Sequence, residues 1–327
     1  MKNRWNIQLV LVLICTLNIF ASNTDILTSY RVNGIDNIEK QLDKELTNIQ
    51  YWEEFLKNKD TKFGYMESYC DVLTCNKQKS KLSIYRKDEN TSKYKLVKEF
   101  PAFTGKEKGD KLKEGDLKTP IGIYELTEKI LKVDPFYGPL AFVTSYPNTY
   151  DKYRHKTGQG IWIHGLPLNQ ERDEFTKGCI AIENPSIECL NKHLDLTKTI
   201  LLIDKADVKT DVPKKDLALI LAQLYSWRYA WIYNDLEQYL NFYDESFKRF
   251  DGMDKSEFST YKTRIFNKKE DKTIIFTNIN VLPYPDTENV YKITFNEQYR
   301  SDSFSFTGNK VLIVKLKDNK ISIITEK

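Results

Sequence analysis

The chain contains the stretch GIWIHG at residues 160–165, followed by TKGCIAI at residues 176–182. Each stretch is a short apolar run with a glycine at its edge, a pattern typical of a buried β-strand beside a tight turn. The two runs carry His164 and Cys179, fifteen residues apart, in a chain with only three His and five Cys. A cysteine is a strong nucleophile as the thiolate, and a neighbouring imidazole can generate that thiolate near neutral pH. The spacing alone leaves a second interpretation open, in which Cys179 is a buried structural residue and His164 is unrelated to it.

The proposed chemistry makes further demands on the residues near this pair. If Cys179 is the nucleophile, His164 takes its proton and later shuttles protons to a leaving amine or from attacking water. No acidic residue stands at an obvious spacing to orient the imidazole, so we expect a backbone carbonyl, such as that of Gly165, to do so. The backbone N–H groups of Gly178 and Cys179 can form an oxyanion hole, because glycine lets the chain approach a substrate closely.

The N-terminus predicts export. Lys2 and Arg4 precede an apolar run at residues 7–20, and Ala21 begins a pair of small residues suited to cleavage. We interpret residues 1–21 as a secretory signal peptide. The alternative is an uncleaved membrane anchor, for which the run is short. No second apolar run of spanning length follows, so we expect no integral membrane span in the mature protein.

The rest of the chain divides into three regions. Residues 22–62 predict an amphipathic helix that braces a domain, because apolar residues recur at three- and four-residue steps from Ile35 to Leu56. Residues 63–208 contain short apolar runs separated by polar, Gly and Pro turns, which predicts a β-sandwich or a small barrel. Residues 209–327 begin with helical, aromatic-rich runs and end in strand-like runs, which predicts an α+β domain with a concave sheet face.

The composition narrows the class of protein. Hydrophobic residues make up 40% of the 327 residues and charged residues 29%, as in a globular chain. The net charge of +4 is spread along the sequence, so we expect no nucleic-acid partner. The scattered His and the lack of a C-x-x-C pair predict neither a metal site nor a cofactor. Cys70 and Cys75 can form a disulfide in an oxidising compartment, or can be a free residue and a strand residue.

Two polar segments have simple interpretations. The charged residues between Gly105 and Gly115 are interpreted as a solvated connection. The run DENTS at residues 88–92 forms a polar turn, in which Asn90 fits the acidic-x-Asn-x-Ser/Thr pattern of bacterial N-glycosylation. An ordinary turn is the alternative for this segment.

Residues 73–203 resemble the YkuD-type L,D-transpeptidase family. The signature of that family is a His-Gly pair followed by a Ser/Thr-x-Gly-Cys element, which here are His164-Gly165 and TKGC at residues 176–179. Further matches stand in the same order along the chain: GDLKTPIG at 115–122, YPN at 146–148, KTG at 156–158, and Asn184.

The resemblance implies a β-sandwich with Cys179 and His164 in a cleft, acting on peptidoglycan stem peptides without a cofactor. Cys179 would attack the carbonyl at the L-centre of meso-diaminopimelate, release the terminal D-Ala and form a thioester. Water would then give a tripeptide, which is L,D-carboxypeptidase activity. A second stem-peptide amine would instead give a 3-3 cross-link, which is L,D-transpeptidase activity.

One departure from the family pattern concerns substrate binding. Many members have Arg two residues after the Cys, where this chain has Ala181. Another residue must then position the substrate. The candidates by position are Lys156, Arg172, Thr176 and Lys177. The alternative for each of the three cationic residues is an exposed side chain with no role in binding.

Residues 214–327 resemble a domain like nuclear transport factor two, a cone with an open pocket that we expect Lys310 and Glu326 to line. Joined to the catalytic region, this domain resembles the periplasmic L,D-carboxypeptidases that set the shape of curved and helical Gram-negative bacteria. The resemblance implies a periplasmic location, peptidoglycan as partner and an association with cell-shape proteins. A non-catalytic wall-binding scaffold is the rival of another class.

Overall fold

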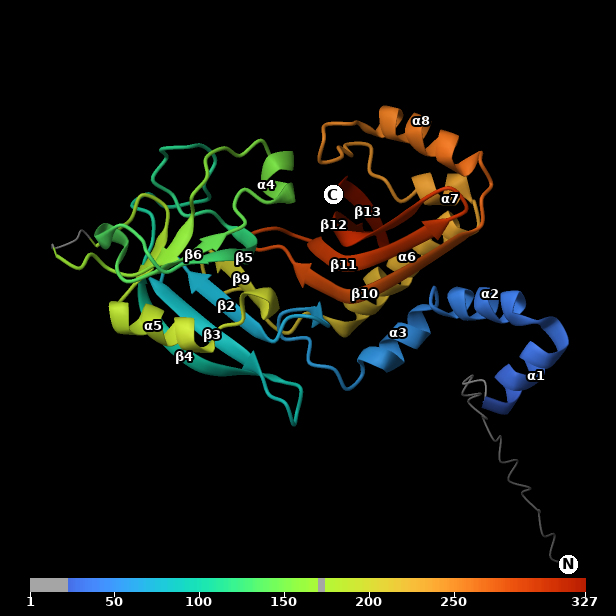
Figure 1. The fold of residues 1–327 in the computed structure, drawn as a ribbon, viewed down its shortest axis with the longest axis horizontal. Coiled ribbons are helices and arrows are strands. Elements are labelled where there is room, and N and C mark those ends of the chain that lie inside the picture. The colour runs from blue at the N-terminus through green and yellow to red at the C-terminus, as the bar shows by residue number, and fades with distance from the viewer. Residues whose placement is uncertain (1–22, 170–173) are drawn as a thin grey trace, which may run out of the picture. The chain divides into compact units, whose positions relative to one another are not determined.

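Figure 1 shows the computed structural model, which describes residues 23–169 and 174–327. The predicted signal peptide at residues 1–21 and the candidate Arg172 lie outside this part of the chain. Within the described residues, no helix combines the length and the apolar character that crossing a membrane requires. The chain divides into two units, Met1–Lys44 and Glu45–Lys327.

The N-terminal region forms three helices where the sequence predicted one long amphipathic helix. These are α1 (Asn23–Asn33), α2 (Ile35–Glu45) and α3 (Ile49–Leu56). The break before α3 has a local cause, because the Asn48 side chain accepts a hydrogen bond from the N–H of Gln50 at 3.0 Å and so caps a new helix. The predicted bracing contact belongs to α3, whose Trp52 stacks on Tyr225 at 5.2 Å between ring centroids.

The sheet-rich fold predicted for residues 63–208 is confirmed, and its strands close into a barrel in the order β2-β3-β4-β8-β7-β6-β5-β9. Alternate side chains of these strands fill the interior with Ile, Leu and Phe. The strands are β2 (Asp71–Asn76), β3 (Lys81–Lys87), β4 (Tyr94–Phe103), β5 (Gly122–Ile130), β6 (Ala141–Thr144), β7 (Trp162–His164), β8 (Ile180–Ile182) and β9 (Thr199–Asp204). The short helices are η1 (Pro135–Tyr137), α4 (Thr149–Tyr153), α5 (Asn184–His193) and η2 (Leu196–Lys198).

The C-terminal α+β domain is also confirmed. Its sheet runs in the order β1-β10-β11-β12-β13, and the long helix α6 packs along it (Figure 1). Strand β1 precedes the barrel in sequence. The chain therefore contributes β1 to this sheet, forms the barrel, and then adds the other four strands to the sheet. The elements are β1 (Tyr65–Met66), α6 (Lys214–Ile232), α7 (Leu236–Leu240), α8 (Lys255–Phe266), β10 (Lys272–Pro283), β11 (Val290–Ser301), β12 (Ser305–Lys317) and β13 (Lys320–Glu326).

The barrel and the C-terminal domain meet at Tyr284. Its hydroxyl lies 2.9 Å from Asn148 Nδ2, and its ring packs edge-on against Tyr150 at 4.6 Å between centroids. The guanidinium of Arg154 lies over the Tyr150 ring. Burial raises the pKa of the Tyr284 hydroxyl well above its usual value. Because Asn148 also caps α4, this helix is held from both domains.

Cys70 and Cys75 do not form a disulfide. All four described cysteines are free, and Cys75 points into the barrel core, where burial raises the pKa of its thiol to about 12. Cys70 lies just before the same extended strand, and five residues of strand span roughly 16 Å, too far for a disulfide.

Asn90 is exposed in its turn, and its glycosylation stays a prediction.

The charged segment between Gly105 and Gly115 is not simply a solvated connection. The Lys111 side chain is 4% exposed and its ammonium lies 2.8 Å from the Asp116 carboxylate, itself 9% exposed. Burial would raise the pKa of Asp116, but the Lys111 ammonium and three backbone N–H groups outweigh it and hold this pKa well below its usual range. The segment is therefore anchored from inside.

We expect Asp116→Asn to lower the free energy of unfolding by about 3–5 kcal/mol near neutral pH, because it leaves the Lys111 ammonium buried without its counter-charge. Folding depresses the pKa of Asp116, so its contribution is complete above the unfolded value of about 4 and is lost as the pH falls below it. Urea unfolding between pH 7 and pH 3 should show the gap between wild type and variant closing in acid.

The matched control for this prediction is Asp207→Asn. Asp207 pairs with Lys79 at 2.5 Å, but both side chains are well exposed, so the loss should be about 0–1 kcal/mol. An Asp116→Asn protein no less stable than the Asp207→Asn protein would contradict the prediction.

Candidate active site

The register of two parallel strands brings His164 and Cys179 together. Strand β7 pairs with β8 so that Ile163 lies opposite Ile180 and His164 opposite Ala181. Both isoleucines belong to the barrel core, so the alternating side chains of His164 and Cys179 lie on the outer face. Cys179 stands two residues before Ala181, which places its Cα diagonally across from that of His164 at roughly 8 Å. An imidazole and a thiol can meet across that diagonal.

His164 is held in one orientation. Its side chain is buried, at 1% exposure, and its Nδ1 lies 2.7 Å from the carbonyl oxygen of Gly165. A carbonyl can only accept a hydrogen bond, so Nδ1 carries the hydrogen and Nε2 keeps the lone pair of the neutral ring. The nitrogen left for proton transfer is therefore Nε2.

Two other segments hold the backbone around the Gly165 carbonyl, which accepts from His164. The N–H of Gly165 donates to the carbonyl of Tyr137 at 2.9 Å, and the N–H of Leu166 donates to Asn184 Oδ1 at 2.8 Å. A Cβ on Gly165 would lie 2.3 Å from Asn184 Oδ1, so only glycine fits here. These contacts explain why the His-Gly pair and Asn184 occur together in the sequence pattern: all three hold the carbonyl that accepts from the imidazole.

The loop before β8 presents Cys179 through hydrogen bonds to Thr176. The Thr176 hydroxyl accepts from the N–H of Gly178 at 2.9 Å and donates to the carbonyl of Cys179 at 2.7 Å. Gly178 has a positive φ of 139, and a Cβ there would lie 2.9 Å from the carbonyl oxygen of Lys118. The Cys179 thiol donates to the carbonyl of Gly160 at 3.4 Å.

These contacts affect the predicted oxyanion hole and substrate-binding residues. The N–H of Gly178 is engaged by Thr176 and can serve an oxyanion only if that contact opens. Thr176 itself is buried and shapes the loop, whereas Lys177 is exposed beside it. The structure says nothing of Arg172.

Lys156, which we predicted to bind substrate, lies in a buried ion-pair cluster. Its side chain is 0% exposed, and its ammonium lies 2.7 Å from Asp110 and 2.9 Å from Asp151. Both partners precede Lys156 in the sequence, and one of them stands 46 residues away, which hid the pairing from spacing arguments. Lys156 therefore ties the segment after α4 to the charged loop.

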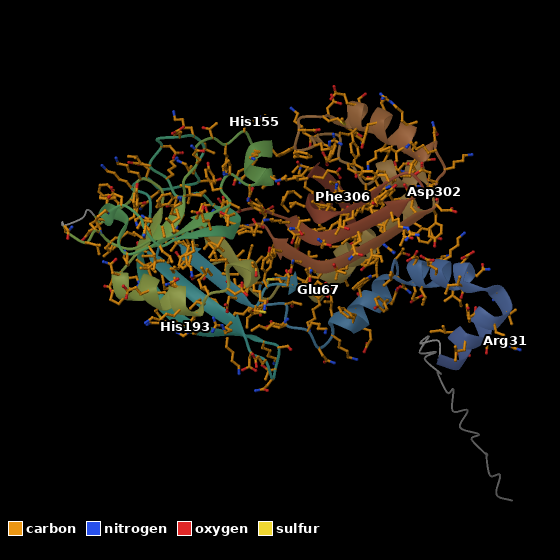
Figure 2. All side chains as sticks on the ribbon, in the orientation of Figure 1. Arg31, Glu67, His155, His193, Asp302 and Phe306 are labelled. Atoms are coloured by element: carbon orange, nitrogen blue, oxygen red, sulfur yellow. The ribbon has the colours of Figure 1, made fainter. Side chains whose placement is uncertain are left out.

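The aromatic neighbours of His164 were not predicted from the sequence. The ring of Tyr137 lies 5.0 Å from the imidazole at 89°, and 5.2 Å from the ring of Trp162. The signal was the segment DPFYGP at residues 134–139, in which a capping Asp, a Pro and a Gly indicate a short turn. The other two His residues lie far apart on the barrel, His155 after α4 and His193 at the end of α5 (Figure 2).

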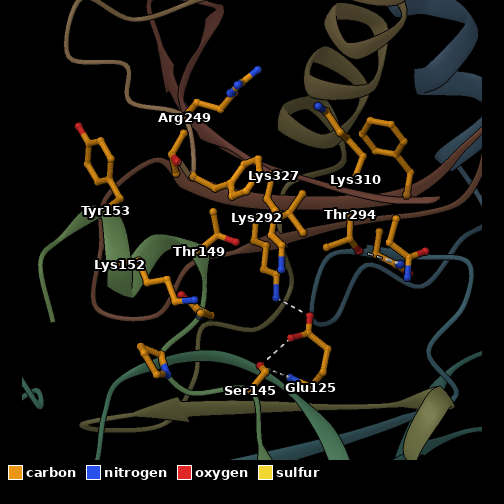
Figure 3. A pocket seen from close by; sticks show the side chains of 18 of the residues that line it. Glu125, Ser145, Thr149, Lys152, Tyr153, Arg249, Lys292, Thr294, Lys310 and Lys327 are labelled. Atoms are coloured by element: carbon orange, nitrogen blue, oxygen red, sulfur yellow. Dashed lines mark hydrogen bonds and ion pairs between the residues drawn. The ribbon is translucent and has the colours of Figure 1, made fainter. Parts of the chain in front are cut away.

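A second feature is a cavity of about 970 Å³ between the barrel and the C-terminal domain (Figure 3). Among its described lining residues are neither Cys179 nor His164, but there are six Lys or Arg side chains and one acid, Glu125. The cationic residues are Lys152, Lys248, Arg249, Lys292, Lys310 and Lys327.

Glu125 joins the two walls of this cavity. It accepts from Lys292 at 2.5 Å and from the Ser145 hydroxyl at 2.7 Å. Burial would raise the pKa of Glu125, but the Lys292 ammonium outweighs it and lowers this pKa. Of the predicted pocket residues, Lys310 lines the cavity, and Glu326 is buried behind it at 3.4 Å from its ammonium. Lys292 and Lys310 are thus paired with acids, as is Arg249 with Asp251, so the positive charge left in the cavity lies on the exposed Lys152, Lys248 and Lys327.

Two family models match the chain in order. The YkuD L,D-transpeptidase catalytic domain matches residues 71–212, and the Cds6 C-terminal NTF2-like domain matches residues 219–327. Within the described residues, no group of three or more His, Cys, Asp or Glu is placed to hold a metal ion.

Solved structures match most of the chain. The helical cell shape determining protein Pgp2 from Campylobacter jejuni is 39% identical, with a TM-score of 0.78 over 86% of this chain and 99% of the Pgp2 chain. Bd1075 from Bdellovibrio bacteriovorus is 27% identical, with a TM-score of 0.64 over 83% of this chain and 96% of its own.

A shorter match is to YafK of Escherichia coli, 34% identical over 80 residues. That stretch is 24% of this chain and only 29% of YafK. The matches to Pgp2 and to the two family models span both domains that the structure shows. The chain belongs to the YkuD-type L,D-transpeptidase family, with an NTF2-like C-terminal domain and a function related to peptidoglycan.

Proposed function

We propose that the protein is an exported, periplasmic cysteine L,D-carboxypeptidase that removes the terminal D-Ala from tetrapeptide stems of peptidoglycan. The observation that carries this proposal is the placement of His164, with Nδ1 on the Gly165 carbonyl and Cys179 diagonally across the strand pair. The two-domain likeness to a cell-shape protein supports trimming of wall peptides as the outcome of the chemistry.

The first half of the reaction forms a thioester. His164 Nε2 takes the proton of the Cys179 thiol, and the thiolate attacks the carbonyl carbon at the L-centre of meso-diaminopimelate. The Cys179 N–H, joined by that of Gly178 once Thr176 releases it, faces the negative charge that develops on the carbonyl oxygen. The bond to D-Ala then breaks, and Nε2–H protonates the departing amine.

The second half consumes water. Nε2 takes a proton from water as its oxygen attacks the thioester carbon, and the Cys179 sulfur leaves and regains a proton. The products are a tripeptide stem and D-Ala. If a stem-peptide amine entered in place of water, the same residues would make a 3-3 cross-link, so the acceptor alone separates the two activities.

We expect the mature protein to release one D-Ala from purified disaccharide-tetrapeptide, and Cys179→Ala to release none, because only the thiolate can form the thioester. Mass spectrometry of the products checks this. The matched control is Cys189→Ala, a half-buried cysteine of α5, which should act like wild type. Cross-linked dimers would establish the transpeptidase, and an unchanged substrate with every protein would favour the wall-binding scaffold.

We further propose that the basic cavity holds peptidoglycan while the barrel acts on it. Stem peptides carry several carboxylates, which the exposed Lys152, Lys248 and Lys327 in the cavity would attract. Lys310 would contribute its charge there, and Glu326 would fix its position. Trimming directed in this way to part of the wall would influence cell shape.

We expect the double variant Lys152→Glu and Lys248→Glu to bind purified sacculi roughly 5- to 10-fold more weakly at low salt, because both exposed charges line the cavity. The difference should disappear near 1 M salt, where screening acts within about 3 Å. A sedimentation assay measures binding. Lys98→Glu, an exposed change on β4, is the control, and equal losses for both proteins would argue against the cavity.

A further inference from the structure

Beyond the predicted pair, the geometry points to Tyr137 as the residue that positions the general base. We propose that the flat ring of Tyr137 holds the imidazole of His164 in the plane that lets Nε2 reach the Cys179 thiol. This inference rests on the proposed roles of His164 and Cys179 and adds a residue to them.

The hydrogen bond from His164 leaves one freedom open. The 2.7 Å contact between Nδ1 and the Gly165 carbonyl fixes one nitrogen, but the ring can still tilt about that contact. The Tyr137 ring lies 5.0 Å away and is turned 89° to the imidazole, an edge-to-face arrangement. A perpendicular ring at that distance blocks the tilt.

Tyr137 acts on His164 by a second route through its backbone. Its carbonyl accepts the N–H of Gly165, whose own carbonyl faces Nδ1. The approach is close, because a Cβ on Gly138 would lie 2.8 Å from the Cα of Gly165. One residue therefore restrains both the imidazole ring and its hydrogen-bond acceptor.

The turn that carries Tyr137 is fixed without help from His164. Asp134 caps it by accepting from the N–H of Phe136 at 2.9 Å, and Pro135 sets the first φ. Gly138 ends it with a positive φ of 77. The Tyr137 ring also packs at 5.2 Å against Trp162, two residues before His164 on the same face of β7. The ring is thus a rigid support.

The strands on either side leave room for this ring. His164 pairs with Ala141 on β6 and with Ala181 on β8, and both alanines are fully buried. Because both neighbours have only a methyl side chain, they leave space beside the imidazole for the Tyr137 ring. The alanine that replaces the arginine of other family members has a physical role here, because a long side chain would compete with Tyr137 for this space.

The test compares Tyr137→Ala, Tyr137→Leu and Tyr137→Phe. The first two remove the flat ring and the third keeps it, so a hydroxyl effect separates from a packing effect. Tyr85→Ala is the control, since Tyr85 packs edge-on against Phe63 at 5.0 Å in the same domain. All are made with Cys70 and Cys189 replaced by serine, so that the accessible thiol left is Cys179.

Two readouts are followed: kcat and KM for D-Ala release, and the rate of alkylation by iodoacetamide from pH 5 to pH 10. We expect Tyr137→Ala and Tyr137→Leu to lower kcat roughly 10- to 100-fold with KM changed less than about twofold, as for a misplaced catalytic group. Their alkylation profiles should shift to higher pH, because a tilted imidazolium stabilises the thiolate less. Tyr137→Phe should restore both readouts to within about threefold.

The inference is overturned if Tyr137→Leu keeps the parent alkylation profile, if Tyr137→Phe is as impaired as Tyr137→Ala, or if Tyr85→Ala shifts the profile equally. Failure of the proposed function looks different. In that case the parent protein itself would be alkylated like its His164→Ala form at every pH, whatever stands at residue 137.

Discussion

The active-site geometry depends on a single contact, between His164 Nδ1 and a carbonyl that can only accept. That contact fixes the tautomer of the neutral ring, and with it the nitrogen that is left for proton transfer. A carboxylate in this place would add charge and could take up a proton itself, whereas a peptide carbonyl can do neither. The position of this carbonyl therefore depends on the backbone. Gly165 must lie between Asn184 and the turn that ends at Gly138, where no side chain fits. Two of the family's matching residues, Gly165 and Asn184, are explained by this contact.

Buried ion pairs support the loops around that contact. Lys111 pairs with Asp116 within the charged loop, and Lys156, through Asp110 and Asp151, joins that loop to the segment that runs from α4 toward Gly160. These pairs cost desolvation and add little net stability over apolar packing, but losing one partner leaves a buried charge. They therefore favour one arrangement of the loops, which suits a site whose thiol contacts a loop carbonyl.

The sequence predicted what is local or repeated, and it missed what joins distant segments. Periodicity located the barrel, the C-terminal domain and the two strands that carry His164 and Cys179. Lys156 looked like an exposed substrate ligand, since nothing near it in sequence shows that Asp110 neutralises it in a buried site. Tyr137 stands 27 residues before His164 and reaches it only because β6 and β7 pair after the turn. The helix expected from Ile35 to Leu56 divided at Asn48, whose capping propensity competes with the continuing apolar pattern.

The distribution of charge separates the candidate active site from the cavity that we propose to bind the wall. Of the cationic candidates near the Cys loop, Lys156 is neutralised and Lys177 is exposed, and Ala181 stands where the family pattern described above has an arginine in many members. Backbone N–H groups are the donors that we propose for a developing oxyanion, and that of Gly178 becomes available only when its contact with Thr176 opens. The positive charge gathers instead in the cavity between the domains, where Lys292 and Glu125 join the walls. Helix α4 lines that cavity with Thr149 and Lys152, while its Asp151 holds Lys156. The same five-residue helix thus contributes to the basic cavity on one side and to the support of the catalytic loops on the other, which explains why both domains hold it.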